Sequence, residues 1–212
     1  MKHHVLKHDP YWHVAGLSAG LLFMLLLAIA RFSPELLYEL DTLVAAPLHV
    51  LQTYDWMLLV VAITTLGDGV AIALVSIGAL YLLHVRYIDA LRLGVLILAT
   101  YLSVVSGKVF VARLRPEEIV WIDPLTSFAF PSGHTALATA LYGYIAVLAY
   151  RRAHTPFGRV LACTLPLLLI VLVALSRVLL NAHFFTDVIG GVLLALFWIA
   201  IVFMLPHQSL RR

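Results

Sequence analysis

Residues 158–205 read GRVLACTLPLLLIVLVALSRVLLNAHFFTDVIGGVLLALFWIAIVFML. Two apolar runs, 158–176 and 184–205, make up most of this stretch, and each is long enough to cross the ~30 Å hydrocarbon core of a bilayer as a helix. Arg177, His183 and Asp187 gather where the first run ends and the second begins. The pattern predicts two membrane-spanning helices joined by a short polar turn.

The same pattern extends along the whole chain of 212 residues, which is 63% hydrophobic and 12% charged. This composition excludes an ordinary soluble domain, and the net charge of +3 is too small to indicate nucleic-acid binding. Six apolar runs have the length of a span: 13–31, 68–85, 89–109, 133–150, 158–176 and 184–205. We therefore expect an all-α, polytopic membrane protein with six transmembrane helices in one membrane-embedded domain, 1–212.

Two further features of the chain are the length of its first apolar run and its single cysteine. The first apolar run is longer than the ~7–15 residues of the apolar h-region of a signal peptide, so we expect a retained helix. The single cysteine, Cys163, lies inside an apolar run and is predicted to be a buried free thiol without a disulfide partner.

The segment between the first two runs has a different character. Residues 33–35, Ser-Pro-Glu, form a typical helix start, and leucines then recur at helical spacing opposite acids that include Glu39 and Asp41. We expect an interfacial amphipathic helix over about 34–48. The run 56–66 is too short to cross a membrane alone, so it either extends the following span or doubles back.

Positive charge is distributed unequally between the two sides of a six-span arrangement. Nine of the fourteen basic residues fall on the side of the termini and the second and fourth loops: Lys2, Lys7, Arg86, Arg92, Arg151, Arg152, Arg159, Arg211 and Arg212. The positive-inside rule places both termini in the cytoplasm. The compact size favours a bacterial inner membrane, with the polar clusters on its periplasmic face. Trp56 and Trp121 are expected at the membrane interface.

The polar cluster at the end of the chain combines Ser176-Arg177 with His183 and Asp187. Residues four apart share a helix face, so His183 and Asp187 are expected to touch. A carboxylate on one ring nitrogen fixes the tautomer and leaves the other nitrogen free as a nucleophile. A helix cap beside a basic residue is an alternative interpretation of this cluster alone.

A second cluster, Pro131-Ser132-Gly133-His134, opens the run at 133–150. Ser132 is a suitable N-cap, and the backbone N–H groups of Ser132, Gly133 and His134 are predicted to form an anion site at the positive helix end. His134 is expected to donate or accept a proton there. Alone, the tetrad is more typical of an ordinary helix start.

A third group of polar residues, Lys108 and Arg115-Pro116, follows the run at 89–109. Lysine offers a point charge to phosphate and arginine a planar fork. A basic helix end would explain the position but not the side, because the positive-inside rule depletes this face of cations.

Taken together, the clusters resemble the three signatures of the type-2 phosphatidic-acid phosphatase superfamily, the integral-membrane lipid phosphate phosphatases related to vanadium haloperoxidases. The matching residues are Lys108, Arg115 and Pro116, then Pro131, Ser132, Gly133 and His134, then Ser176, Arg177, His183 and Asp187. The resemblance covers about 56–205. The chain departs from it at Arg113-Leu114, where Arg-Pro is frequent, and at Leu179 and Asn181, where tyrosine and glycine are common.

The resemblance implies a role for each of these residues. His183 attacks the phosphorus to give a phosphohistidine, Asp187 orients the imidazole, and His134 protonates the leaving oxygen and then activates water. The phosphate-binding residues are Lys108, Arg115, Ser132, Gly133 and Arg177. We expect no cofactor and no metal, because the cations replace a divalent ion and no carboxylate cluster suits Mg²⁺.

The resemblance also implies a lipid substrate that reaches the site from the bilayer. Undecaprenyl diphosphate is the first choice, and phosphatidylglycerol phosphate or phosphatidate is the alternative. Transfer of the phosphoryl group to a second lipid shares the same first step. A transporter would place polar residues along several spans, whereas here they gather at one end, and a vanadate-dependent haloperoxidase is expected to be soluble.

Overall fold

The computed structural model describes residues 10–49, 51–52, 54–116 and 126–205. Within these ranges every regular element is a helix, which confirms the all-α prediction there. The elements are α1 (Pro10–Phe32), α2 (Glu35–His49), α3 (Tyr54–Thr64), the 3₁₀ turn η1 (Thr65–Gly67), α4 (Gly69–Leu82), α5 (Tyr87–Val111), α6 (Gly133–Arg152), α7 (Pro156–Leu179) and α8 (Phe185–Met204). The predictions that concern Lys2, Lys7, Trp121, Arg211 and Arg212 fall outside the described residues.

Four of the helices in the described ranges, α1, α5, α7 and α8, are long and apolar enough to cross a membrane. The short α3 joins α4 through η1 at a bend of 63°, and the bent pair would make a fifth span. Helix α6 covers the predicted run 133–150 but is not among those that pass on apolar composition. The protein is therefore a multi-pass membrane protein, and six crossings remain a prediction.

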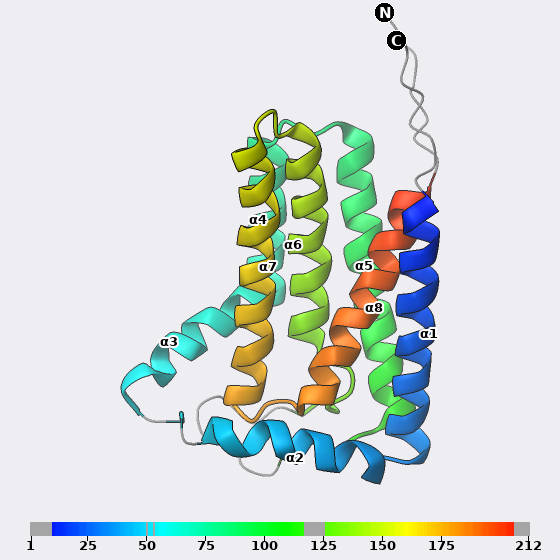
Figure 1. Cartoon of the computed structure of the whole chain (residues 1–212), viewed down its shortest axis with the longest axis vertical. Coiled ribbons are helices and arrows are strands. Elements are labelled where there is room, and N and C mark those ends of the chain that lie inside the picture. The colour runs from blue at the N-terminus through cyan, green and yellow to red at the C-terminus, as the bar shows by residue number, and fades with distance from the viewer. Residues whose placement is uncertain (1–9, 50, 53, 117–125, 206–212) are drawn as a thin grey trace, which may run out of the picture.

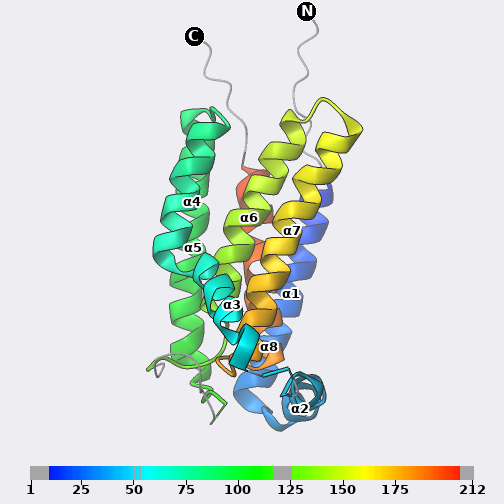
Figure 2. The ribbon, with the colours of Figure 1, turned by 90° about the vertical axis from the view of Figure 1, so that its left-hand side faces the viewer.

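The long helices run side by side, and α2 lies across one end of the bundle (Figure 1). After a turn of 90°, α2 is seen nearly end-on below the same bundle (Figure 2). The first residue of α1 and the last of α8 lie at the opposite end (Figure 1). The end of α5 and the starts of α6 and α8 therefore meet at the α2 end, which is where all three polar clusters lie.

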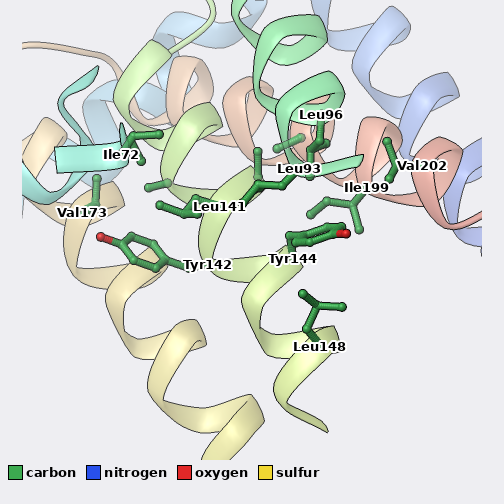
Figure 3. Packing of buried hydrophobic residues seen from close by; sticks show 13 residues of the cluster. Ile72, Leu93, Leu96, Leu141, Tyr142, Tyr144, Leu148, Val173, Ile199 and Val202 are labelled. Carbon is green, nitrogen blue, oxygen red and sulfur yellow. The ribbon is translucent and has the colours of Figure 1, made fainter. Parts of the chain in front are cut away.

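Helix α6 occupies the centre of the bundle. Its alanines at 136, 138 and 140 are fully buried, which lets neighbouring helices approach closely. The cluster around it contains Leu96 of α5, Val173 of α7 and Ile199 of α8 (Figure 3). Two tyrosine hydroxyls of α6 donate to backbone carbonyls, Tyr142 to Leu66 at 3.0 Å and Tyr144 to Asp89 at 2.8 Å. A helix that protein surrounds on several sides can carry such polar groups, which explains why α6 is less apolar than its neighbours.

The bend between α3 and α4 depends on Gly67. A Cβ atom there would lie 2.9 Å from Cγ1 of Val173 and 3.1 Å from the carbonyl oxygen of His134, so any side chain would force α6 or α7 to shift. Glycine thus allows the chain to pass directly against the first turn of α6. As a result, Asp68 lies beside His134.

Two predictions about side-chain direction are wrong. Asp41, predicted to lie on the polar face of α2, is only 2% exposed and points into the bundle with Leu37, whereas Leu36 and Glu39 are exposed. Cys163, predicted to be buried, is exposed on α7. Periodicity places residues on a helix face, but the face that meets the bundle depends on partners elsewhere in the chain.

Candidate active site

The turn between α7 and α8 positions His183. The carbonyl oxygen of Arg177 accepts hydrogen bonds from the backbone N–H groups of Ala182 at 3.1 Å and His183 at 3.2 Å. Asn181 adopts a φ of 50° in this turn. Asparagine enters the left-handed region more readily than other non-glycine residues, which explains how it occupies a position where glycine is expected.

The prediction that His183 and Asp187 share one helix is wrong, because Phe184 is extended and α8 begins after it. The two side chains nevertheless lie close, with 3.6 Å between Nδ1 of His183 and Oδ2 of Asp187. This distance is longer than a hydrogen bond, and Nδ1 has no hydrogen-bond partner among the described residues.

The other ring nitrogen of His183, Nε2, lies 3.2 Å from Nη1 of Arg115. A guanidinium can only donate, so Nε2 is the acceptor and the proton of the neutral ring is on Nδ1, facing Asp187. Burial lowers the pKa of His183 well below 6.5, and the positive charges of Arg177, Arg115 and Lys108 act in the same direction. The imidazole is therefore neutral near pH 7, with its lone pair on Nε2.

Asp187 is completely buried, and both of its carboxylate oxygens accept hydrogen bonds. Oδ2 accepts from the backbone N–H of Phe184 at 3.0 Å, and Oδ1 accepts from Nη1 of Arg113 at 2.8 Å. The sequence analysis treated Arg113 only as part of a departure from a family signature. The sequence could have identified Arg113 as a site residue, because it is a further cation on the face that the positive-inside rule depletes of positive charge.

The segment 127–129 joins the group of Lys108 and Arg115 to the cluster Pro131–His134. Nζ of Lys108 donates to the carbonyl oxygens of Phe128 and Ala129. Nε of Arg115 donates to the carbonyl oxygen of Ser127 at 2.7 Å, and Nη2 donates to the hydroxyl of Ser127 at 3.0 Å. The backbone of Ala129 also donates to the carbonyl of Arg113 at 2.8 Å. These contacts bring Lys108 and Arg115 to the start of α6.

Ser132 takes the N-cap position of α6, but it contributes differently from the prediction. Its backbone N–H donates to the carbonyl oxygen of Asp187 at 3.0 Å, and its hydroxyl pairs with the hydroxyl of Thr135 at 3.0 Å. The Ser132 N–H is therefore already used within the protein. The N–H groups of Gly133 and His134 lie in the first helical turn, where a helix provides no internal acceptor, so they remain candidates for binding an anion.

His134 and Arg177 are each completed by a partner that the sequence did not predict. Nε2 of His134 lies 2.6 Å from Oδ1 of Asp68. Nη1 of Arg177 donates to the hydroxyl of Thr64 at 2.6 Å, and its Nε lacks a hydrogen-bond partner among the described residues. Thr64 is the last residue of α3 and Asp68 lies between η1 and α4, so both partners are next to the bend between these helices.

Two cavities flank these residues. An apolar groove of about 710 Å³ lies between α4, α5 and α6, and Lys108, Gly133 and His134 are at its polar end. Along α5 its lining extends from Ala90 to Lys108, a rise of about 27 Å at ~1.5 Å per residue. A second, more polar cavity of about 540 Å³ lies beneath α2 and is lined by Arg115 and His183 among others.

The assembled site can bind an anion and transfer protons. It places an unprotonated imidazole nitrogen among cationic side chains, with a second imidazole nearby. No group of three or more His, Cys, Asp or Glu side chains suited to a metal ion occurs in the part of the chain that the structure describes.

Comparison with known proteins agrees with this geometry. A curated relative, phosphatidylglycerophosphatase B of Bacillus subtilis (strain 168), is 37% identical over 92 residues, which cover 42% of this chain and 44% of that protein. The chain thus matches less than half of the length of that relative. The crystal structure of a transmembrane PAP2 type phosphatidylglycerolphosphate phosphatase from Bacillus subtilis superposes with a TM-score of 0.73 at 26% identity, covering 93% of this chain and 99% of that chain. The model of the PAP2 superfamily matches residues 89–211, so the chain belongs to the PAP2 superfamily.

Proposed function

We propose that the chain is a lipid phosphatase of the membrane, a phosphoric-ester hydrolase that removes a terminal phosphate through a phosphohistidine on His183 and without a metal ion. One observation carries this proposal: the buried, neutral imidazole of His183 presents its Nε2 lone pair to Arg115. The same end of the bundle holds Lys108 and Arg177. Cations fixed around a neutral nucleophile suit an in-line displacement at phosphorus.

The reaction proceeds in two displacements. Nε2 of His183 forms a bond to phosphorus while the phosphorus–oxygen bond to the lipid breaks, and His134 donates a proton to the leaving oxygen. Water then attacks the phosphohistidine, His134 accepts its proton, and inorganic phosphate leaves. Arg115 donates to Nε2 of His183, and this hydrogen bond moves to a phosphoryl oxygen when substrate binds.

The two cavities support an orientation for the lipid. In an in-line displacement the leaving group departs opposite the nucleophile. His183 lines the cavity beneath α2, and His134 lines the apolar groove. The leaving lipid therefore lies on the groove side. Leu98 and Tyr101 in its wall are more than half exposed, so the groove is accessible from the side of the bundle that faces the bilayer.

Among lipid phosphates, phosphatidylglycerol phosphate is now the favoured substrate. The sequence favoured undecaprenyl diphosphate, but the curated relative and the solved structure are both named for phosphatidylglycerol phosphate. Transfer to a second lipid uses the same phosphohistidine and differs only in the acceptor.

We place the site on the non-cytoplasmic face of a bacterial plasma membrane, with both termini in the cytoplasm. Helix α2, the end of α5 and the starts of α6 and α8 lie at one end of the bundle (Figure 1), and the polar clusters are at these helix ends. The other end carries Arg86, Arg151, Arg152 and Arg159, next to the α4–α5 and α6–α7 turns. The positive-inside rule orients that arginine-rich end toward the cytoplasm.

Phosphate release by the purified protein tests the proposal. Phosphatidylglycerol phosphate, phosphatidate and undecaprenyl diphosphate are supplied in detergent micelles, with EDTA and without an acceptor lipid. We expect phosphate release, fastest from phosphatidylglycerol phosphate and unchanged by EDTA. Release from none of these substrates would overturn the function, and loss of release in EDTA would overturn the metal-free mechanism.

Alanine variants of two histidines, one in the site and one outside it, provide the test and its control. His183→Ala is expected to reduce release by on the order of 10⁶-fold, as removal of a nucleophile does. His13→Ala, at an exposed position on α1, is the control and should behave as wild type. Near-normal activity of His183→Ala would show that another group is the nucleophile.

A further inference from the structure

Helix α2 places one buried carboxylate against the candidate active site. Asp41 is 2% exposed although α2 lies across the outside of the bundle. Its Oδ1 accepts the backbone N–H of Thr186 at 2.8 Å, and its Oδ2 accepts the hydroxyl of Thr186 at 2.9 Å. Oδ2 also accepts Nη2 of Arg113 at 2.6 Å. Three donors from the protein thus saturate this carboxylate.

Arg113 connects Asp41 to the carboxylate behind His183. Its Nη2 donates to Asp41, and its Nη1 donates to Oδ1 of Asp187 at 2.8 Å. Its guanidinium carbon lies 4.3 Å from the centre of the Phe184 ring, so it is also fixed from one face. One guanidinium therefore bridges the two buried aspartates.

We propose that Asp41 is a positioning residue for the reaction: it holds Arg113 against Asp187 and thereby sets the carboxylate that orients His183. This inference rests on the proposed function. Asp187 has two hydrogen-bond partners, the Phe184 N–H and Arg113, and Nδ1 of His183 lies 3.6 Å from its Oδ2. A shift of Arg113 therefore changes the position of the carboxylate relative to the imidazole.

Apolar packing of α2 against the bundle does not explain the burial of Asp41. A leucine at this position would bury apolar area, whereas a carboxylate must be desolvated and needs a full set of donors. Leu37 already provides an apolar contact of α2 with the bundle. What the carboxylate adds is a fixed acceptor for Thr186 of α8 and for Arg113.

The first test compares Asp41→Asn with Glu39→Gln, an exposed acid two residues away on α2. The asparagine oxygen can still accept the Thr186 N–H, but its amide group cannot accept a hydrogen bond from Arg113. In the micellar phosphatidylglycerol phosphate assay, we expect kcat to fall by about 10- to 100-fold for Asp41→Asn, with KM changed by less than about twofold, because displacing a catalytic group by an ångström costs on this order. Glu39→Gln is expected to match wild type.

The second test is a double-mutant cycle with Arg113→Lys. A single ammonium cannot bridge both carboxylates, so Arg113→Lys should lower kcat by a similar factor while the contacts of Asp41 with Thr186 remain. Asp41→Asn should then cost less than about threefold in the Arg113→Lys background, because both changes break the same connection. Arg113→Lys alone also tests the inference if Asp41→Asn does not fold, as judged by its thermal unfolding in detergent.

The outcomes distinguish a failure of the proposed function from a failure of the positioning role of Asp41. A wild type that releases no phosphate overturns the proposed function, and the positioning role with it. An active wild type with Asp41→Asn equal to Glu39→Gln overturns the positioning role alone. Losses that multiply in the double variant, or a change confined to KM, overturn it as well.

Discussion

The site contains two histidine–aspartate pairs that differ in burial. The side chains of His183 and Asp187 are 2% and 0% exposed, whereas those of His134 and Asp68 are 26% and 47% exposed. The buried pair is 3.6 Å apart and is held through Arg113, and the exposed pair is hydrogen-bonded at 2.6 Å at the polar end of the groove. The pair that we assign to nucleophilic attack is thus shielded from solvent. The pair that we assign to proton transfer is partly exposed to it.

This difference matches the demands of the two roles. A nucleophilic imidazole must be neutral and correctly oriented before the substrate arrives, and burial among cations provides the neutral form. A proton donor that later activates water must reach both the leaving oxygen and the solvent. The two pairs are therefore not interchangeable, and substitution of their carboxylates should separate them.

The largest effect is expected from Asp187→Asn. An amide can turn its NH₂ toward Nδ1 and favour the wrong tautomer of His183, and comparable changes in serine proteases lower kcat by about 10⁴-fold. We expect a loss of kcat of at least about 10³-fold in phosphate release from micellar lipid, with the protein still folded in detergent. A loss below about tenfold would mean that Asp187 does not control the imidazole.

A smaller effect is expected from Asp68→Asn. Water can replace part of the interaction of an exposed carboxylate, so kcat should fall by at most about 10²-fold, the lower end of the range for proton-transfer catalysis. Steady-state kinetics of the two asparagine variants, measured side by side, check the order. If Asp68→Asn were the more damaging variant, the assignment of the two pairs would have to be exchanged.

The sequence predicted the pair that is close in the chain and missed the partners that are distant. His183 and Asp187 are four residues apart, and helical spacing suggested their contact although they do not share a helix. Asp68 is separated from His134 by 66 positions, and Asp41 from Thr186 by 145. Local periodicity contains no information about such contacts, because they depend on how the helices pack.

The prediction of the fold also succeeded for local features and failed for those that depend on distant contacts. Apolar run length predicted the positions of the long helices, since it is set by the thickness of the bilayer. It could not predict that α6 is central and therefore less apolar, or that Gly67 passes directly against the first turn of α6. Both depend on neighbouring helices. The run 56–66 was left open for the same reason, and it forms α3 and most of η1, which meet α4 at the bend.

A third prediction concerns pH, because the buried pair should make the fold sensitive to acid. The pKa of His183 is lowered by burial and then by nearby cations, so the folded state binds its proton less readily than the unfolded chain does. The contribution to stability is complete above about pH 6.5 and is lost as the pH falls below that value, by up to about 1.4 kcal/mol per pH unit. Thermal unfolding in detergent at pH 7.5 and 5.5 measures this loss.

The variant His183→Gln isolates that contribution from other titrating groups. It lacks the imidazole, so its unfolding temperature should fall less between pH 7.5 and 5.5 than that of wild type, and His13→Gln should fall as much as wild type. Equal falls for wild type and His183→Gln would show that the histidine is not held in its neutral form.

The smallest effect is expected in the turn that carries the buried pair, at Asn181. Its φ of 50° suits glycine, so Asn181→Gly should change the free energy of unfolding by less than about 0.5 kcal/mol. Asn181→Val should lose about 1–2 kcal/mol, because a β-branched side chain is strained in the left-handed region. Denaturant unfolding in detergent distinguishes the two variants. If valine were tolerated as well as glycine, this turn would not be conformationally restricted, and the fixed position of His183 would have to come from the contacts of Arg115 and Asp187 alone.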